Sequence, residues 1–213
     1  MKKALVAAAL LSLICTAITF AAEDGQTPNT QSQAVVLFEQ GKSLLQSDKY
    51  EEAKKAFTEA VTLNPNYAEA YESLGKVLLL QLRYDEATIE FAKAIDLAPD
   101  NYTAYFNQGV AYYHLRKFKE VIHDFTEVIR LYPKNHAAYN IRGIAYFEQG
   151  KLDEAIRDYS KAIELNPGYT KAYNNRGIAY LRQGKTTEAE QDFAKTGQPM
   201  PKPTEKRRNK CVF

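Results

Sequence analysis

Hydrophobic, small and polar positions recur along this chain with a period of 34 residues. Glycine, proline, an aromatic residue and a small or short branched residue each return five times at a fixed phase. These positions are Gly41, Gly75, Gly109, Gly143 and Gly177; Pro65, Pro99, Pro133, Pro167 and Pro201; Phe57, Phe91, Phe125, Tyr159 and Phe193; and Ala53, Ala87, Val121, Ala155 and Ala189. Such a period, kept without insertion, is typical of stacked supersecondary units.

Each period is predicted to form two helices. The stretches 139–149 and 152–165 each place small and apolar residues on one helical stripe. Gly143 has no side chain, so the second helix can approach closely there, with the ring of Tyr159 filling the space beside it. We therefore expect Gly143→Leu to force the paired helices apart and to destabilise the array.

Turn and cap signals mark the ends of the predicted helices. Glycine followed by lysine at 150–151 and 184–185 predicts the turn between the two helices of a unit. Acidic residues near the positive end of each second helix are Glu52, Glu86, Glu120, Glu154 and Glu188. The recurring proline disfavours helical geometry at the residue before it, so each second helix should end at Asn64, Ala98, Tyr132 and Asn166.

The segments AYNNRGIAYLRQGKTTEAEQDF and AYNIRGIAYFEQGKLDEAIRDYSKAIELNP resemble tetratricopeptide repeats. The resemblance covers residues 34–203 and implies an all-α fold: a right-handed superhelical solenoid of five tandem helix-turn-helix units with a concave inner face. The units are 34–67, 68–101, 102–135, 136–169 and 170–203.

Two features depart from the usual repeat. The leucine expected one place before the glycine occurs only as Leu74, and other units have Gln40, Gln108, Arg142 and Arg176 there. The fifth unit stops early, because Gly197 and Pro199 stand where the other units continue their last helix. That last helix is polar, which suits the exposed end of a solenoid.

The resemblance also implies a peptide-binding groove along the first helices of the third to fifth units. Carried over position by position, the groove residues are Phe106, Asn107, Val110, Tyr113, Asn140, Ile141, Ile144, Phe147, Lys171, Asn174, Asn175, Ile178, Leu181 and Arg182. We expect the apolar members to bury a partner's side chains and the asparagines to bind its backbone. The alternative is that these residues pack between neighbouring repeats and that the asparagines bridge helices. On the groove hypothesis, Asn140→Ala combined with Asn174→Ala weakens partner binding without loss of stability.

The flanking segments have different compositions. Residues 1–22 contain Lys2 and Lys3 followed by an apolar run, as in an export signal that is cleaved after Ala21 or Ala22. The uncharged run 4–22 is also long enough to remain as a membrane anchor. Residues 23–33 are predicted to be a flexible linker, and 204–213 a basic disordered tail. The protein is therefore expected in the periplasm or outside the cell, or tethered to the membrane.

The remaining composition argues against several functions. The net charge is +2 and most of the excess basic residues lie near the two ends, so a nucleic-acid partner is not expected. The three histidines have no metal-ligand spacing, and neighbouring His123 and Asp124 should point apart on a helix. We expect no catalytic residue, no metal and no cofactor.

These features together predict a non-enzymatic adaptor or scaffold that binds a protein or peptide segment in the concave face of the repeats. The alternative is an envelope assembly protein that self-associates, or that is tethered by its N-terminal segment; the sequence leaves its oligomeric state open.

Overall fold

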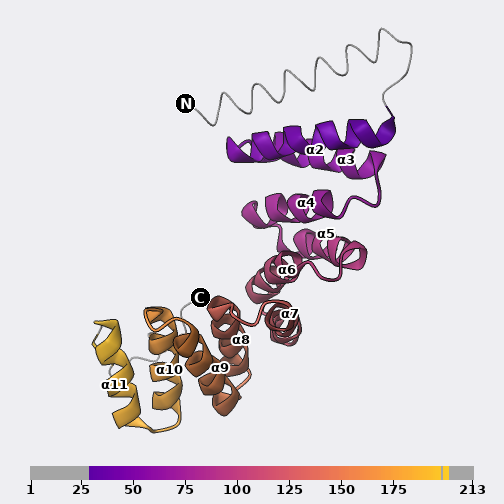
Figure 1. Ribbon diagram of the computed structural model, residues 1–213. Coiled ribbons are helices and arrows are strands. Elements are labelled where there is room, and N and C mark those ends of the chain that lie inside the picture. Colours follow the sequence, from indigo (N-terminus) through magenta and orange to yellow (C-terminus); the bar gives the residue numbers. More distant parts are fainter. Residues whose placement is uncertain (1–28, 198, 202–213) are drawn as a thin grey trace. The chain divides into compact units, whose positions relative to one another are not determined.

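The computed structural model describes residues 29–197 and 199–201, and every regular element in these ranges is an α-helix (Figure 1). The helices are α2 (Thr30–Gln46), α3 (Tyr50–Leu63), α4 (Ala68–Leu80), α5 (Tyr84–Leu97), α6 (Tyr102–His114), α7 (Phe118–Leu131), α8 (His136–Glu148), α9 (Leu152–Leu165), α10 (Thr170–Arg182) and α11 (Thr186–Thr196). The predicted export signal 1–22 and the predicted tail 204–213 lie outside the described residues.

The chain divides into two compact bodies, Met1–Pro99 and Asp100–Phe213. The first body contains the helix pairs α2–α3 and α4–α5, and the second contains α6–α7, α8–α9 and α10–α11. Within each body, the two helices of a pair pack together and the second helix also packs on the first helix of the next pair. The five predicted helix-turn-helix units are thus present.

The recurring glycine of each first helix lies against the aromatic ring of the second helix, as expected. A Cβ atom at Gly143 would lie 2.7 Å from Cε1 of Tyr159, and one at Gly75 would lie 2.7 Å from Cε1 of Phe91. Both rings are fully buried. The absence of a side chain on the first helix therefore makes room for the aromatic ring of the second.

The turn inside each pair uses a residue in the left-handed conformation. Gly150 has φ +76°, its N–H donates to the carbonyl of Phe147, and the N–H of Lys151 donates to the carbonyl of Tyr146. This pattern is a Schellman motif. The first three pairs make the same turn with non-glycine residues at positive φ, namely Asp48, Leu82 and Arg116.

Helix ends agree with the predicted cap signals, with one difference at the N-terminus. In each second helix before the last, the residue preceding the proline is the C-cap, directly after the last helical residue: Asn64, Ala98, Tyr132 and Asn166. The helix α11 stops at Thr196 because Gly197 turns to φ +67°. The predicted linker 23–33 is wrong for its last four residues, because α2 already begins at Thr30 behind an Asn29 cap, and residues 23–28 lie outside the described residues.

Candidate functional site

The predicted groove residues all lie on the first helices of the second body, α6, α8 and α10, but they do not form one open surface. Six of them are buried: Asn140, Ile141, Ile144, Phe147, Asn175 and Ile178. For these six residues the alternative expectation, packing between neighbouring repeats, describes the structure. They are buried because neighbouring repeats close over them, with Ile141 in one hydrophobic cluster and Ile144, Phe147 and Ile178 in another.

The two buried asparagines bridge neighbouring repeats. Nδ2 of Asn175 on α10 donates to Oδ1 of Asn140 on α8 at 2.9 Å, and both residues are fully buried. Nδ2 of Asn140 has no hydrogen-bond partner. Because a buried amide depends on its partner, Asn140→Ala should reduce stability. The expectation that Asn140→Ala leaves stability unchanged is thus corrected, whereas for the partly exposed Asn174 it stays a prediction.

The other eight predicted residues are accessible, and we call them the α6–α10 surface. They are Phe106, Asn107, Val110 and Tyr113 on α6, and Lys171, Asn174, Leu181 and Arg182 on α10. Lys171 and Arg182 are exposed, and the rest are partly exposed. The α6 members are mostly apolar or aromatic, and the α10 members are mostly polar or basic.

Contacts below the α6–α10 surface hold its side chains in place. The ring of Phe106 meets the ring of Phe125 edge-on, with 5.1 Å between centroids. The guanidinium of Arg182 lies over the ring of Phe147 at 4.9 Å from its centroid, within the range of a cation–π interaction. Buried Phe147 therefore supports an exposed cation rather than contacting a partner itself.

A second set of polar residues, which the sequence analysis noted only as a departure from the usual repeat, forms a ladder inside the second body. Arg142 on α8 donates to both carboxylate oxygens of Asp158 on α9, and its third hydrogen bond reaches Thr126 on the preceding α7 at 3.2 Å. Arg176 repeats this arrangement with Asp192 and with Ser160. Each arginine thus links its own repeat to the one before it.

Tyrosine rings flank both arginines. The guanidinium of Arg142 lies 5.7 Å from the ring centroid of Tyr139 and 6.0 Å from that of Tyr146. In the last repeat, Tyr173 and Tyr180 take the same places around Arg176. The signal for this ladder was the spacing of 16 residues between arginine and aspartate, which occurs twice in phase with the repeat.

The third repeat has the ladder's aspartate but not its arginine. Gln108 occupies the arginine position, and Asp124 is only 2 % exposed. Oδ1 of Asp124 lies 3.0 Å from Nδ1 of His123, and its Oδ2 has no hydrogen-bond partner. The expectation that these two side chains point apart is wrong. Burial raises the pKa of Asp124 to about 6, and the hydrogen bond with His123 opposes that rise.

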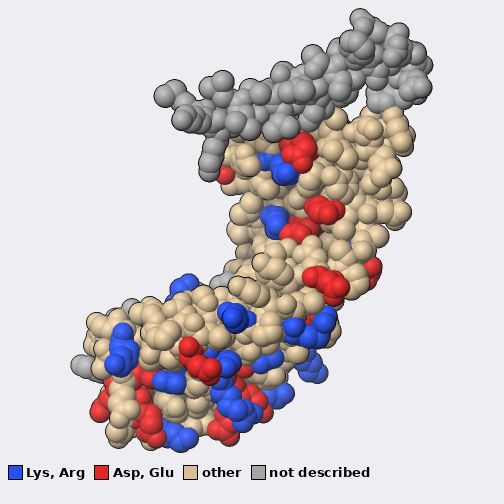
Figure 2. All heavy atoms as spheres, in the orientation of Figure 1, with Lys and Arg blue, Asp and Glu red and all other residues tan. Residues whose placement is uncertain are grey.

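The described surface offers little for other kinds of chemistry. Residues 29–197 and 199–201 contain no group of three His, Cys, Asp or Glu side chains placed to hold a metal ion. In the same ranges, no helix is both long and apolar enough for a membrane span. Figure 2 shows acidic and basic side chains interspersed over the visible face of the second body.

Family models match four stretches of the chain. Those described as tetratricopeptide repeats match residues 38–102, 102–135 and 125–157, and one described as a TPR repeat matches 143–184. The chain belongs to the tetratricopeptide repeat family. Together with the helix pairs described above, these matches establish a tetratricopeptide solenoid fold, and they support a role as a protein–protein interaction adaptor.

Solved structures with this fold are numerous. A crystal structure of MamA protein is 26% identical, with a TM-score of 0.75 over 77% of this chain and 90% of that one. MamA from Desulfovibrio magneticus RS-1 is 23% identical, with a TM-score of 0.74 over 78% of this chain and 93% of that one. YrrB, described as a TPR protein with an unusual peptide-binding site, is 23% identical, with a TM-score of 0.73 over 86% and 90%. No curated protein matches the chain.

Proposed function

We propose that the protein is a non-enzymatic adaptor that binds an extended segment of another protein across the first helices of the second body. The observation that carries this proposal is the α6–α10 surface. Its eight residues occupy the places that the resemblance to tetratricopeptide repeats assigns to a groove, and they remain accessible in the folded chain. The description of YrrB as a peptide-binding TPR protein supports the same kind of ligand.

The chemistry of the α6–α10 surface indicates what such a segment contains. Phe106, Val110 and Tyr113 offer apolar and aromatic contacts at one side. At the other side, the exposed Lys171 and Arg182 offer positive charge beside the amide of Asn174. A peptide with apolar residues followed or preceded by acidic residues complements both parts.

The buried groove positions have a different role in this proposal. Ile144, Phe147 and Ile178 form a dry cluster between the repeats, so they fix the spacing of α8 and α10. The hydrogen bond between Asn140 and Asn175 fixes the same spacing by a polar contact. A preformed spacing lowers the ordering cost when a peptide binds.

Selection from a random peptide library displayed on phage tests this proposal on the full chain. Enriched peptides should combine apolar with acidic residues. A synthetic copy of an enriched peptide should bind at least about tenfold more weakly to the double variant Lys171→Glu and Arg182→Glu, because the acidic peptide then faces acidic side chains. Arg157→Glu is the matched control, since Arg157 is exposed on α9, outside the surface. Selection of no peptide, or equal losses in both variants, would sink the proposal.

We also propose that the adaptor acts outside the cytoplasm, because residues 1–22 have the composition of an export signal. Cell fractionation with N-terminal sequencing tests this part separately. An exported product should begin at Ala22 or Glu23, which corresponds to cleavage after Ala21 or Ala22. A membrane fraction that keeps Met1 would indicate a retained anchor, and a cytoplasmic product would contradict export.

A further inference from the structure

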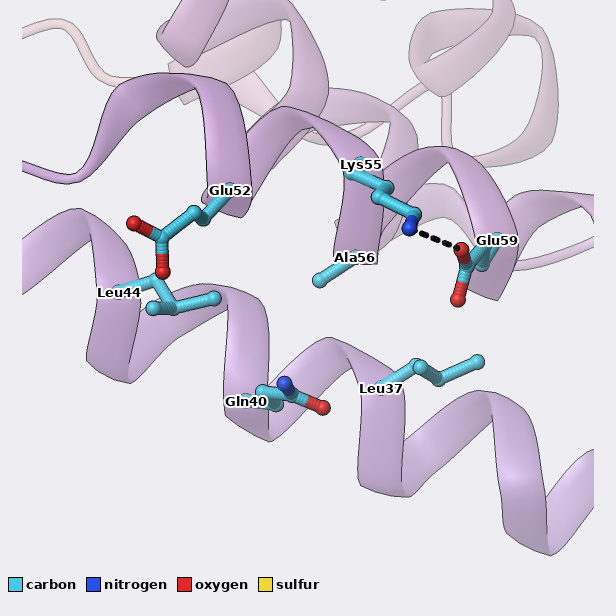
Figure 3. Close-up of a pocket in the computed structure, with 7 residues that line it drawn as sticks. All are labelled: Leu37, Gln40, Leu44, Glu52, Lys55, Ala56 and Glu59. Atoms are coloured by element: carbon cyan, nitrogen blue, oxygen red, sulfur yellow. Dashed lines mark ion pairs between the residues drawn. The ribbon is translucent and has the colours of Figure 1, made fainter.

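A cleft of about 230 Å³ lies between α2 and α3 of the first body (Figure 3). Leu37, Gln40 and Leu44 line it from α2, and Ala56 lies on the α3 side. Figure 3 shows both leucine side chains standing in the space between the two helices, together with Gln40. Both leucines remain partly exposed in the folded chain. The first helix pair thus leaves apolar surface uncovered.

The repeat phase identifies what this surface is for. Adding 34 to Gln40 and Leu44 leads to Leu74 and Leu78, which are only 6% and 4% exposed. They lie on α4, which packs against α3, the second helix of the preceding repeat. In the second body the same face of α8 receives α7, as the hydrogen bond from Arg142 to Thr126 shows. In later repeats, the surface that corresponds to this cleft is covered by the second helix of the preceding repeat. We call this surface the helix-docking face.

Within the described part of the chain, no helix precedes α2 to cover its helix-docking face. In the second body, the helices that cover the equivalent faces share a sequence pattern. An isoleucine is followed by a hydroxyl residue four positions later and by a second isoleucine three positions after that. In α7 these are Ile122, Thr126 and Ile129, and in α9 they are Ile156, Ser160 and Ile163. Ile122, Ile129 and Ile156 pack against the hydrophobic clusters. The three positions form one stripe of a helix.

We propose that the cleft between α2 and α3 binds an amphipathic helix of another protein, with aliphatic residues at the first and eighth positions of a stripe and a small hydroxyl residue at the fifth. The aliphatic side chains cover Leu37 and Leu44. The hydroxyl group meets the amide of Gln40, which can both donate and accept a hydrogen bond.

Charge at the rim adds to this specificity. Glu52 and Glu59 border the cleft along α3 (Figure 3). Lys49 lies 3.6 Å from Glu52 and Lys55 lies 3.9 Å from Glu59, but the two glutamate side chains remain 61% and 49% exposed. A basic flank beside the apolar stripe would pair with these carboxylates. The sequence of α7 has such a flank, because Lys119 and Arg130 fall beside its Ile–Thr–Ile stripe at helical spacing.

A second copy of this chain fits the cleft less well. Its last helix, α11, is the one that would stack head-to-tail on α2. At the stripe positions α11 has exposed Glu190, exposed Ala194 and, beyond its end, Gly197. It therefore lacks both aliphatic residues that cover the equivalent face in the second body.

A fluorescent peptide with the sequence of residues 118–131 is the probe, added to the full chain and followed by anisotropy. The peptide should bind saturably, and its variant with Ile122→Asp and Ile129→Asp should not. The Leu44→Glu protein should bind it at least about tenfold more weakly, because a carboxylate then faces an apolar stripe. Ile89→Glu is the control, as Ile89 is 55% exposed on α5 outside the cleft. Helix content and melting of both proteins are measured alongside.

Several results would overturn the proposal. They are failure of the 118–131 peptide to bind, equal binding of the aspartate peptide, or an unchanged affinity in Leu44→Glu with intact helix content. An oligomer that Leu44→Glu dissociates in light scattering would assign the cleft to a second copy. Binding by a chain that starts at Glu23 but not by the full chain would assign it to the protein's own upstream residues.

Discussion

Arg142 on α8 and Asp158 on α9 are joined by two charge-assisted hydrogen bonds, each 2.8 Å long. The two residues are 16 positions apart in the sequence and lie on different helices of the pair. Their side chains are only 16% and 9% exposed. Burial raises the pKa of the Asp158 carboxyl, and Arg142 opposes that rise. Such a pair takes the place that the buried Leu74 has in the second repeat. A charged pair at a buried place makes its two members depend on each other.

Removing one member of this pair should therefore be costly. Arg142→Leu leaves the Asp158 carboxylate buried without its cation, and we expect a loss of about 3 kcal/mol in the free energy of unfolding. The double variant with Asp158→Leu should regain much of that loss. Urea denaturation of the single and double variants measures the coupling, with Lys119→Leu on α7 as an exposed control. Additive losses in the double variant would show that the pair is not coupled.

Asp124 should make the stability of the second body dependent on pH. Its folded pKa of about 6 lies above the ordinary value of 3.8, so folding favours the protonated form. Ionisation of Asp124 therefore lowers the free energy of unfolding. This loss of stability is nearly absent below about pH 4, grows as the pH rises from there through 6, and is constant at higher pH. It amounts to about 2–3 kcal/mol at neutral pH. Asp124→Asn should thus raise Tm at pH 7 and leave it nearly unchanged at pH 4.

The control for this experiment is Asp96→Asn, since Asp96 is exposed on α5. It should shift Tm little at either pH. If Asp124→Asn changes Tm equally at pH 4 and pH 7, the carboxyl does not titrate between them, and the buried environment of Asp124 is not as described.

Gly143 should reject even the smallest side chain. Alanine normally stabilises a helix by about 1 kcal/mol relative to glycine. Here its Cβ would lie 2.7 Å from the Tyr159 ring, so we expect Gly143→Ala to lower the free energy of unfolding by about 1–3 kcal/mol instead. Gly168→Ala, in the loop before α10, is a control without a close contact, because the nearest atom to its Cβ would lie 3.5 Å away. Thermal melts followed by circular dichroism compare the two, and a stabilised Gly143→Ala would contradict the close packing.

Leu82 occupies a backbone conformation that glycine adopts without strain in the later repeats. Its φ is +60°, against +76° for Gly150 and +77° for Gly184 at the same phase. We expect Leu82→Gly to raise the free energy of unfolding by about 0.5–1 kcal/mol, because relief of the left-handed strain outweighs the added freedom of the unfolded chain. Leu80→Gly, within α4, should have the opposite sign. Equal losses in both would show that Leu82 is unstrained.

Much of the fold could be predicted because its determinants are local and periodic. The glycine at 143 and the ring at 159 recur in phase, and their contact needs no knowledge of any other repeat. The proline after each second helix likewise ends that helix through its own geometry, as at Asn64 and Asn166. The left-handed turn was predicted only where glycine marks it, because Asp48, Leu82 and Arg116 carry no such signal.

The sequence by itself determined the repeat length and the helix pairs, and the resemblance to tetratricopeptide repeats predicted which face of each first helix meets a ligand. Only the tertiary structure decided which residues on that face stay open, because the distance between neighbouring repeats is set by packing across both of them. Ile144 and Asn140 are closed off by the next repeat, while Phe106 and Arg182 remain accessible at the same kind of position. The tertiary structure also decided that the Arg142–Asp158 pair and the carboxyl of Asp124 are buried, since burial of a charge depends on how the repeats pack together.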